Sequence, residues 1–183
     1  MTRVAATESS LHLLQLRPAR PADATLLARW RTEPAVAEFQ PLPDVPVDQM
    51  VAYLAPQDWD KFSHGEQERF QWIILAANEA AGWISLIVTS WDHGLAEIGY
   101  SLATPFQRKR LMPQALHLAL VEIFLRTSLE RVEARCAIEN EGSWKVLEVT
   151  GFRREGLLKG YFALNGKRVD NYLYAILRDE FIP

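Results

Sequence analysis

The segment from Ala96 to Leu120 constrains the fold of this 183-residue chain more than any other. It begins as a short apolar run typical of a buried strand, continues through a basic loop, and ends in an apolar stretch long enough for a helix. The first N–H groups of a helix have no partner within it, and the helix dipole favours an anion beside them. Four loop residues add polar or cationic side chains: Gln107, Arg108, Lys109 and Arg110. The segment therefore predicts a strand–loop–helix unit that binds a phosphate group.

Composition and charge are typical of a globular protein. Hydrophobic residues make up 49% of the chain and charged residues 23%, so we expect a single domain over residues 11–183 behind a disordered tail over residues 1–10. The net charge of −3 gives no reason to expect DNA or an anionic membrane as a partner. The single cysteine fits a reducing compartment, and the sequence shows neither a secretory signal nor a membrane-spanning run. These features predict a cytoplasmic protein.

The apolar periodicity predicts the element order β-α-α-β-β-β-α-β-α-β-β. The expected strands are residues 12–17, 70–75, 83–88, 95–102, 131–138, 152–164 and 168–177. The expected helices begin at Pro21, near Val47, after the basic loop and after Asn140. Because a helix joins the fourth and fifth strands, these two should be parallel neighbours, while the others pair antiparallel. The expected fold class is therefore α/β, with a mixed, mostly antiparallel sheet and flanking helices.

Turn residues separate these elements. Residues 78–82 are the expected hairpin turn between the second and third strands, and Asn165-Gly166, the strongest short hairpin signal in the chain, joins the last two. Residues 59–68 are polar and include a glycine, so we expect a connector there. Gly151 is expected to end the helix after Asn140 in a left-handed conformation.

Four sequence blocks, taken in order, resemble a known family. They are Leu16-Arg17-Pro18 with Asp23-Ala24; Ala96-Glu97-Ile98-Gly99-Tyr100-Ser101-Leu102; Val132-Glu133-Ala134-Arg135 leading into Glu139-Asn140-Glu141-Gly142-Ser143; and Val146-Leu147-Glu148 with Gly151-Phe152-Arg153-Arg154-Glu155-Gly156. The ordered set resembles the GNAT superfamily of acyl-CoA-dependent N-acetyltransferases. Within it, the set is similar to the branch of ribosomal-protein N-terminal alanine and serine acetyltransferases.

The resemblance implies a GNAT-like fold and an enzyme that transfers acetyl from acetyl-CoA to a primary amine by direct attack. The acceptor would be a protein N-terminus or a small-molecule amine, and the chain would be a monomer or a homodimer. An α-amine has a pKa of about 7.7–8.0, against about 10.4 for lysine. A weak or water-relayed base would therefore serve an α-amine.

The expected cofactor loop departs from the family pattern, which is Gln/Arg-x-x-Gly-x-Gly/Ala. By resemblance, the residues that hold the CoA diphosphate are Gln107, Arg108, Lys109, Arg110, Leu111 and Met112. Here Arg110 and Met112 replace two small residues. Glycine at such positions allows positive φ and close approach of the phosphate, so the replacements act against CoA binding. Charge-assisted bonds from three cationic side chains act in the opposite direction and favour phosphate binding. The alternative function is a non-catalytic acyl-CoA-binding or interaction protein on the same fold.

Glu97 is the candidate for taking a proton from the amine. Side chains alternate across a strand, so Glu97 shares a face with Gly99 and Ser101, opposite the more apolar residues. The resemblance implies that this face meets the acyl group and that Glu97 acts directly or through a water. The competing interpretation is a structural carboxylate paired with a neighbouring arginine.

Three further positions complete the expected site. Asn140 is a favourable N-cap, which puts Ser143 on the first turn of its helix. The resemblance implies that Asn140 contacts the pantetheine arm, that Ser143 protonates the leaving thiolate, and that the backbone near Leu102 donates to the acyl carbonyl. An ordinary helix cap followed by a first-turn serine is the simpler interpretation of Asn140 and Ser143.

Histidine and cysteine do not indicate other chemistry. The four histidines, His12, His64, His93 and His117, lie far apart with no ligand spacing, so we expect no metal site. Cys136 lies in the middle of an expected strand and should be a small core residue rather than a nucleophile.

Overall fold

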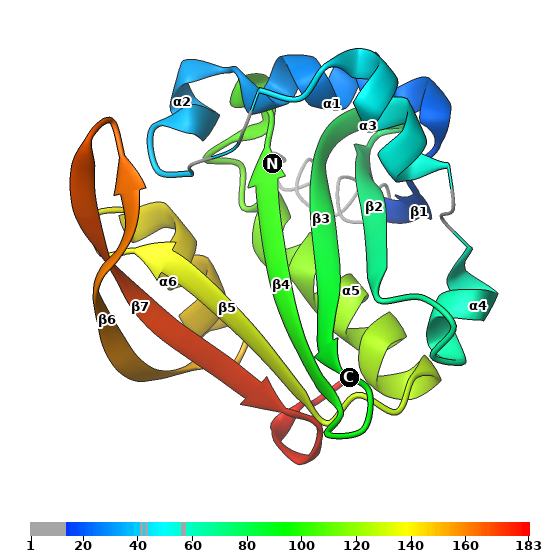
Figure 1. Ribbon diagram of the computed structural model, residues 1–183. Helices are drawn as coiled ribbons and strands as arrows, with labels where there is room; N and C mark the ends of the chain where they lie inside the picture. The colour runs from blue at the N-terminus through cyan, green and yellow to red at the C-terminus, as the bar shows by residue number, and fades with distance from the viewer. Residues whose placement is uncertain (1–13, 41, 43, 56–57) are drawn as a thin grey trace, which may run out of the picture.

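The computed structural model describes residues 14–183 apart from residues 41, 43, 56 and 57, so the expected tail over residues 1–10 lies outside the described residues. The strands form one sheet in the order β1-β2-β3-β4-β5-β7-β6 (Figure 1). They are β1 (Leu14–Pro18), β2 (Arg69–Ala76), β3 (Glu79–Ser90), β4 (Leu95–Leu102), β5 (Arg131–Ala137), β6 (Arg153–Leu164) and β7 (Lys167–Leu177). Neighbouring strands pair antiparallel except β4 and β5, which are parallel. The expected mixed α/β class is confirmed.

The helices lie at one end of the sheet and behind it. They are α1 (Ala24–Arg31), α2 (Pro34–Ala37), α3 (Val47–Leu54), α4 (Trp59–Ser63), α5 (Leu111–Arg126) and α6 (Glu141–Val149), with short 3-10 helices at Pro21–Asp23, Thr104–Phe106 and Arg178–Glu180. In Figure 1, α1, α2 and α3 gather at the upper end of the sheet, whereas α5 and α6 lie behind it. No helix in the described part of the chain is long and apolar enough to cross a membrane.

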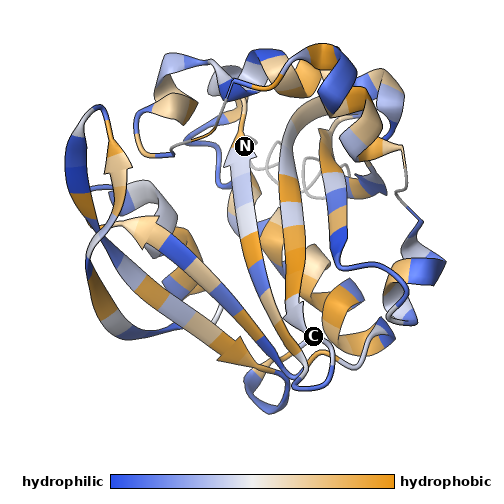
Figure 2. Cartoon of the chain, viewed as in Figure 1, coloured by the Kyte–Doolittle hydropathy of each residue, from blue (hydrophilic) through white to orange (hydrophobic). Residues whose placement is uncertain are grey.

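Alternating side chains along the central strands build the core. Ile84 of β3 and Ile98 of β4 are buried in the main cluster, which includes Leu116 of α5. Trp83, next in sequence to Ile84, belongs instead to a smaller cluster with Trp30 of α1. Figure 2 shows hydrophobic and hydrophilic residues alternating along β5, where every second residue is buried over most of the strand. A strand with one buried face leaves its other face available for a site.

The residues around the basic loop fold as expected. β4 covers Leu95–Leu102, the expected strand, and α5 follows the loop as the crossover to the parallel strand β5. The helix expected after Asn140 is α6, and Gly151 follows it with a φ of +94°. Local patterns of alternation and capping were therefore sufficient to place these elements.

Two connecting segments differ from expectation. The expected connector over residues 59–68 contains helix α4, whose N-cap Asp58 accepts from two backbone N–H groups. Phe62 is the buried residue of this short helix, so the sequence carries little apolar periodicity there. The turn between β2 and β3 lies at Ala77-Asn78, both with positive φ, and residues 79–82 belong to β3.

An ion pair joins β1 to the turn that precedes α1. The Arg17 guanidinium donates to both carboxylate oxygens of Asp23 at 2.7 Å, and the Arg20 N–H donates to the same carboxylate at 2.8 Å. Burial opposes the ionisation of Asp23, but these donors outweigh burial and lower its pKa. Arg17 and Asp23 of the first sequence block therefore have a structural role, because their ion pair joins β1 to the turn before α1.

We expect Asp23→Asn to lower the Tm at about pH 7 by about 2–8 °C, because the partly buried Arg17 loses its counter-charge at a cost of about 1–2 kcal/mol. A carboxylate whose folded pKa is lowered stabilises the fold fully above its unfolded pKa of about 3.9. It loses that contribution as the pH falls through the folded pKa. Thermal melts should therefore show that the difference in Tm between Asp23→Asn and the unchanged protein disappears below about pH 4. A difference in Tm that does not change with pH would contradict a contribution of the Arg17–Asp23 ion pair to stability.

Candidate active site

β4 and β5 separate in the middle of the sheet. Their parallel ladder consists of the register pairs Leu95–Arg131, Ala96–Val132 and Glu97–Glu133. Beyond these pairs the two strands diverge (Figure 1). A cavity of about 650 Å³ lies in this region, which is within the usual size range of small-molecule sites.

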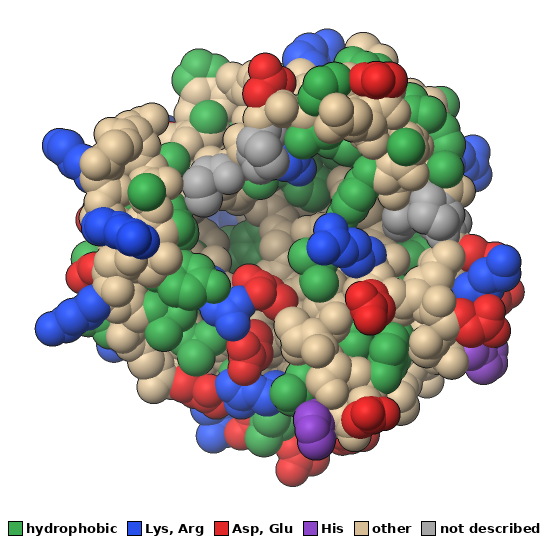
Figure 3. Space-filling view, in the orientation of Figure 1, with side chains coloured by type: hydrophobic (Ala, Val, Ile, Leu, Met, Phe, Trp, Pro, Cys, Tyr) green, Lys and Arg blue, Asp and Glu red, His purple; other side chains and the backbone are tan. Residues whose placement is uncertain are grey.

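The cavity brings together residues from distant parts of the chain. Its polar lining includes Arg31, Arg69, Glu97, Tyr100, Arg135, Asn140 and Ser143. Figure 3 shows this face of the molecule hollowed near its centre, with both cationic and acidic side chains around the hollow. Three expected site residues, Glu97 on β4 and Asn140 and Ser143 at the start of α6, therefore line the same cavity.

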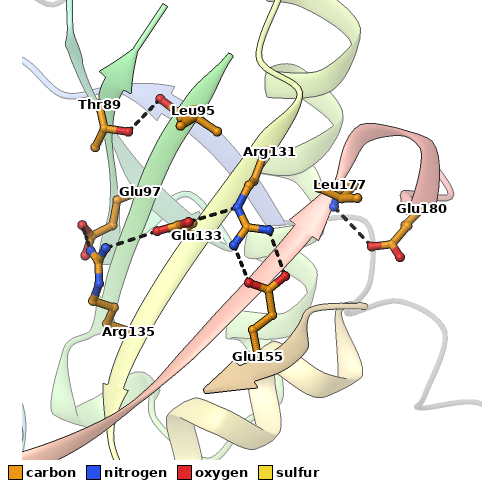
Figure 4. A network of polar contacts seen from close by, with 9 residues as sticks. All are labelled: Thr89, Leu95, Glu97, Arg131, Glu133, Arg135, Glu155, Leu177 and Glu180. Atoms are coloured by element: carbon orange, nitrogen blue, oxygen red, sulfur yellow. Dashed lines mark hydrogen bonds and ion pairs between the residues drawn. The ribbon is translucent and has the colours of Figure 1, made fainter. Parts of the chain in front are cut away.

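Glu97 is part of a network of charged side chains that crosses β4, β5 and β6 (Figure 4). Arg135 contacts Glu97 and also Glu133, the latter at 3.2 Å. Arg131 contacts Glu133 at 3.0 Å and Glu155 on β6. The Glu97 side chain keeps 35% of its surface exposed. Glu97 is thus paired with an arginine, as expected for a structural carboxylate. It also lines the cavity, as a catalytic role requires.

Ser143 is held from two directions. The side-chain oxygen of Asn140 caps α6 by accepting the Ser143 N–H at 3.1 Å. The Tyr100 hydroxyl donates to the Ser143 carbonyl at 3.1 Å and lies 3.2 Å from the Ser143 hydroxyl. Burial raises the pKa of Tyr100, and the hydrogen bond with Ser143 offsets only part of this effect. Tyr100 therefore stays protonated at neutral pH and orients Ser143, a role that strand alternation alone did not indicate.

The backbone of Leu102 faces the region where the strands diverge. The Ala103 N–H donates to Ala81 of β3 at 2.9 Å. Backbone groups point alternately to the two sides of a strand, so the Leu102 N–H and carbonyl point away from β3. The Gln107 side chain donates to this carbonyl at 3.0 Å. Leu102 does not line the cavity itself, but its N–H lies on the side of β4 from which β5 has diverged.

The loop before α5 adopts left-handed conformations without glycine. Arg108 has a φ of +61°, and Arg110, the N-cap of α5, has a φ of +56°, each at a cost of roughly 1–2 kcal/mol. Met112 is buried in the main core, so its side chain does not obstruct the outer side of the loop. The side chains of Arg108, Lys109 and Arg110 are exposed. This loop lies outside the cavity lining and presents three cations at the N-terminus of a long helix.

Cys136 also lines the cavity, although it is buried as expected for a small core residue. Burial raises the pKa of its thiol to about 11, and a hydrogen bond with Ser143 offsets only part of this effect. The thiol is therefore protonated at neutral pH. Within the described ranges, no group of three or more His, Cys, Asp or Glu residues is placed to hold a metal ion.

Two arginines of the cavity wall were not indicated by any sequence pattern. Arg31 ends α1 and Arg69 begins β2, and both line the cavity with Glu97. Each lies in a segment whose sequence reads only as an ordinary helix or strand end. Their shared location follows from the fold, which brings the end of α1 and the start of β2 to the same cavity, and could not have been found from spacing.

Known proteins share this architecture. Residues 14–153 match the family model described as an acetyltransferase (GNAT) domain. The chain belongs to the GNAT acetyltransferase family. The expected resemblance is therefore confirmed for most of the described chain.

Relatives extend this assignment over nearly the whole chain. The uncharacterized N-acetyltransferase p20 of Bacillus licheniformis is 28% identical over 92% of this chain and 94% of its own length. The [ribosomal protein uS5]-alanine N-acetyltransferase of Escherichia coli is 30% identical, over 47% of this chain and 44% of its own. The solved structure of Mycobacterium smegmatis RimJ in complex with CoA-disulfide is 27% identical, with a TM-score of 0.79 over 93% of this chain and 85% of that chain.

The family and its relatives establish the reaction class. This GNAT protein is an enzyme that transfers an acetyl group from acetyl-CoA to an amine. The alternative of a non-catalytic acyl-CoA-binding protein is not favoured. The replaced loop residues are compatible with this assignment, because Met112 packs inward and the cationic side chains stay exposed.

Proposed function

We propose that this acetyltransferase acts on an α-amine, such as a protein N-terminus, and that Glu97 removes the amine proton through a water. Glu97 carries this proposal, because it is the only carboxylate among the described residues that line the cavity. Its charge is already offset by Arg135. A single paired carboxylate suits an amine that is partly neutral at pH 7, whereas a lysine would need about 3.4 kcal/mol more to reach the reactive form.

The remaining residues have separate tasks in this proposal. The Leu102 N–H donates to the acyl carbonyl, where negative charge develops during attack by the amine. The Ser143 hydroxyl, held by Tyr100, supplies a proton to the departing thiolate. Asn140 contacts the pantetheine arm, and the loop from Gln107 to Met112 binds the diphosphate with backbone N–H groups and cationic side chains.

The choice of an α-amine agrees with the name of one relative. The Escherichia coli enzyme is named for acetylating an alanine of ribosomal protein uS5. Its match spans less than half of either chain, so the support from Glu97 and its surroundings carries more weight than the name.

A competition between two amines on one peptide tests the proposal. The probe is a peptide with a free N-terminal alanine and one internal lysine, incubated with acetyl-CoA and analysed by mass spectrometry. We expect the acetyl group on the α-amine at least about tenfold more often than on the lysine, because the α-amine is the easier to deprotonate. A matching peptide with a blocked N-terminus should give little product. Preferential modification of the lysine would contradict the proposal.

A further inference from the structure

We propose that the acceptor of this enzyme carries a carboxylate as well as its amine, and that Arg31 binds this carboxylate. The inference rests on the proposed function, because it names the second group of an α-amine acceptor. The carboxylate can belong to the C-terminus of a short peptide or to an acidic residue close to the N-terminus of a peptide.

The charges of the cavity wall support this proposal. Arg31, Arg69 and Arg135 line the cavity together with Glu97, the one carboxylate among the lining residues that the structure describes. Arg135 is paired with Glu97 and Glu133. Within the part of the chain that the structure describes, neither Arg31 nor Arg69 forms an ion pair. The wall therefore has an excess of positive charge that an anionic group of a ligand would offset.

Arg31 is the better placed of the two unpaired arginines. Arg69 is exposed, whereas Arg31 is partly buried, and its Nε atom is inaccessible to solvent without a hydrogen-bond partner among the described residues. Burial also lowers the pKa of Arg31, and the neighbouring Tyr53 offsets only part of this effect. Leaving a buried polar group unpaired is costly, and the planar fork of a guanidinium matches a carboxylate with two parallel hydrogen bonds. A carboxylate in the cavity would supply the counter-charge that this side chain lacks among the described residues.

The same wall disfavours a polyamine. A polyamine carries several positive charges, and Glu97, the one carboxylate among the described cavity residues, is already paired with Arg135. Like charges brought together in a partly desolvated site repel strongly. We therefore expect spermidine to be a poor acceptor for this enzyme.

Matched acceptors that differ by one carboxylate test the inference. One pair is Ala-Glu-Ala amide and Ala-Gln-Ala amide, and the other is the dipeptide Ala-Ala and its amide, in which the extra carboxylate lies one residue away from the amine. Thiol release from acetyl-CoA gives kcat and KM for each, with spermidine alongside. In at least one pair we expect kcat/KM to be at least about tenfold higher for the acceptor with the extra carboxylate, mainly through a lower KM. The pair that responds identifies the source of the carboxylate.

Variants of α1 connect this preference to Arg31. Arg31→Gln should bring the kcat/KM ratio of the responding pair close to one, and Arg31→Lys should keep part of the preference. Arg29→Gln is the matched control, because Arg29 is exposed on the same helix and does not line the cavity. If Arg31→Gln fails to fold, the acceptor pairs on the unchanged enzyme still show whether the enzyme prefers a carboxylate, and Arg31→Lys tests the role of Arg31.

The outcomes separate this inference from the proposed function. Equal turnover of both members of both pairs would overturn the carboxylate inference but leave the α-amine assignment standing. A preference for spermidine would overturn the carboxylate inference and the α-amine assignment together. A preference that survives Arg31→Gln would overturn the assignment to Arg31. Absence of turnover with every α-amine would overturn the proposed function and the inference with it.

Discussion

Glu97→Gln should lower kcat for an α-amine acceptor by at least about tenfold at pH 7, with little change in the KM for acetyl-CoA. The substitution keeps the size of the side chain but removes the only carboxylate among the described cavity residues. The deficit should shrink as the pH rises above the amine pKa of about 8, because a neutral amine no longer needs a base. Initial rates of thiol release between about pH 6.5 and pH 9, at saturating substrates, measure both effects.

Glu133→Gln is the matched control for this experiment. Glu133 contacts Arg131 and Arg135 in the same charged network, but it does not line the cavity. We expect its kcat to stay within about threefold of the unchanged enzyme. An equal loss in both variants would mean that the network acts by holding the strands together. Full activity of Glu97→Gln would remove Glu97 from the mechanism altogether.

Features set by neighbouring residues were predictable from the sequence. Alternation in β4 indicated its bounds and the face of Glu97, since each depends only on the period of a strand. Asn140 was predictable as a cap because its side chain bonds to the N–H of Ser143, three residues away. Asn165-Gly166 forms the turn between β6 and β7 with positive φ at both residues.

Features set by distant contacts were not predictable. The spatial order places β7 between β5 and β6, and no local pattern encodes that order. The contact between Tyr100 and Ser143 joins β4 to α6 in the wall of the cavity, and Arg31 lines the same cavity from α1. Met112 shows the reverse case: a residue that looked obstructive in the loop motif is harmless because the second position of α5 faces the core.

Gly82→Ala should destabilise the protein through the strand that carries the site. Gly82 is paired with Leu102 across β3 and β4. A Cβ at this position would lie 2.3 Å from the Ser101 carbonyl oxygen and 2.9 Å from the Cα of Leu102. Both are backbone atoms, so the end of β4 must move. We expect a cost of about 2–3 kcal/mol, or a fall in Tm of about 4–12 °C.

The same shift should impair catalysis, because the Leu102 N–H that we assign to the acyl carbonyl would move with the strand. We expect kcat/KM for acetyl-CoA to fall by at least about tenfold at a temperature where Gly82→Ala is still folded. Gly156→Ala is the control, since a Cβ at Gly156 in β6 meets nothing within 4 Å; its Tm and kinetics should change little. A Gly82→Ala variant with a lowered Tm and unchanged kinetics would show that β4 can shift without affecting the reaction, and the role of the Leu102 N–H would then have to pass to another donor.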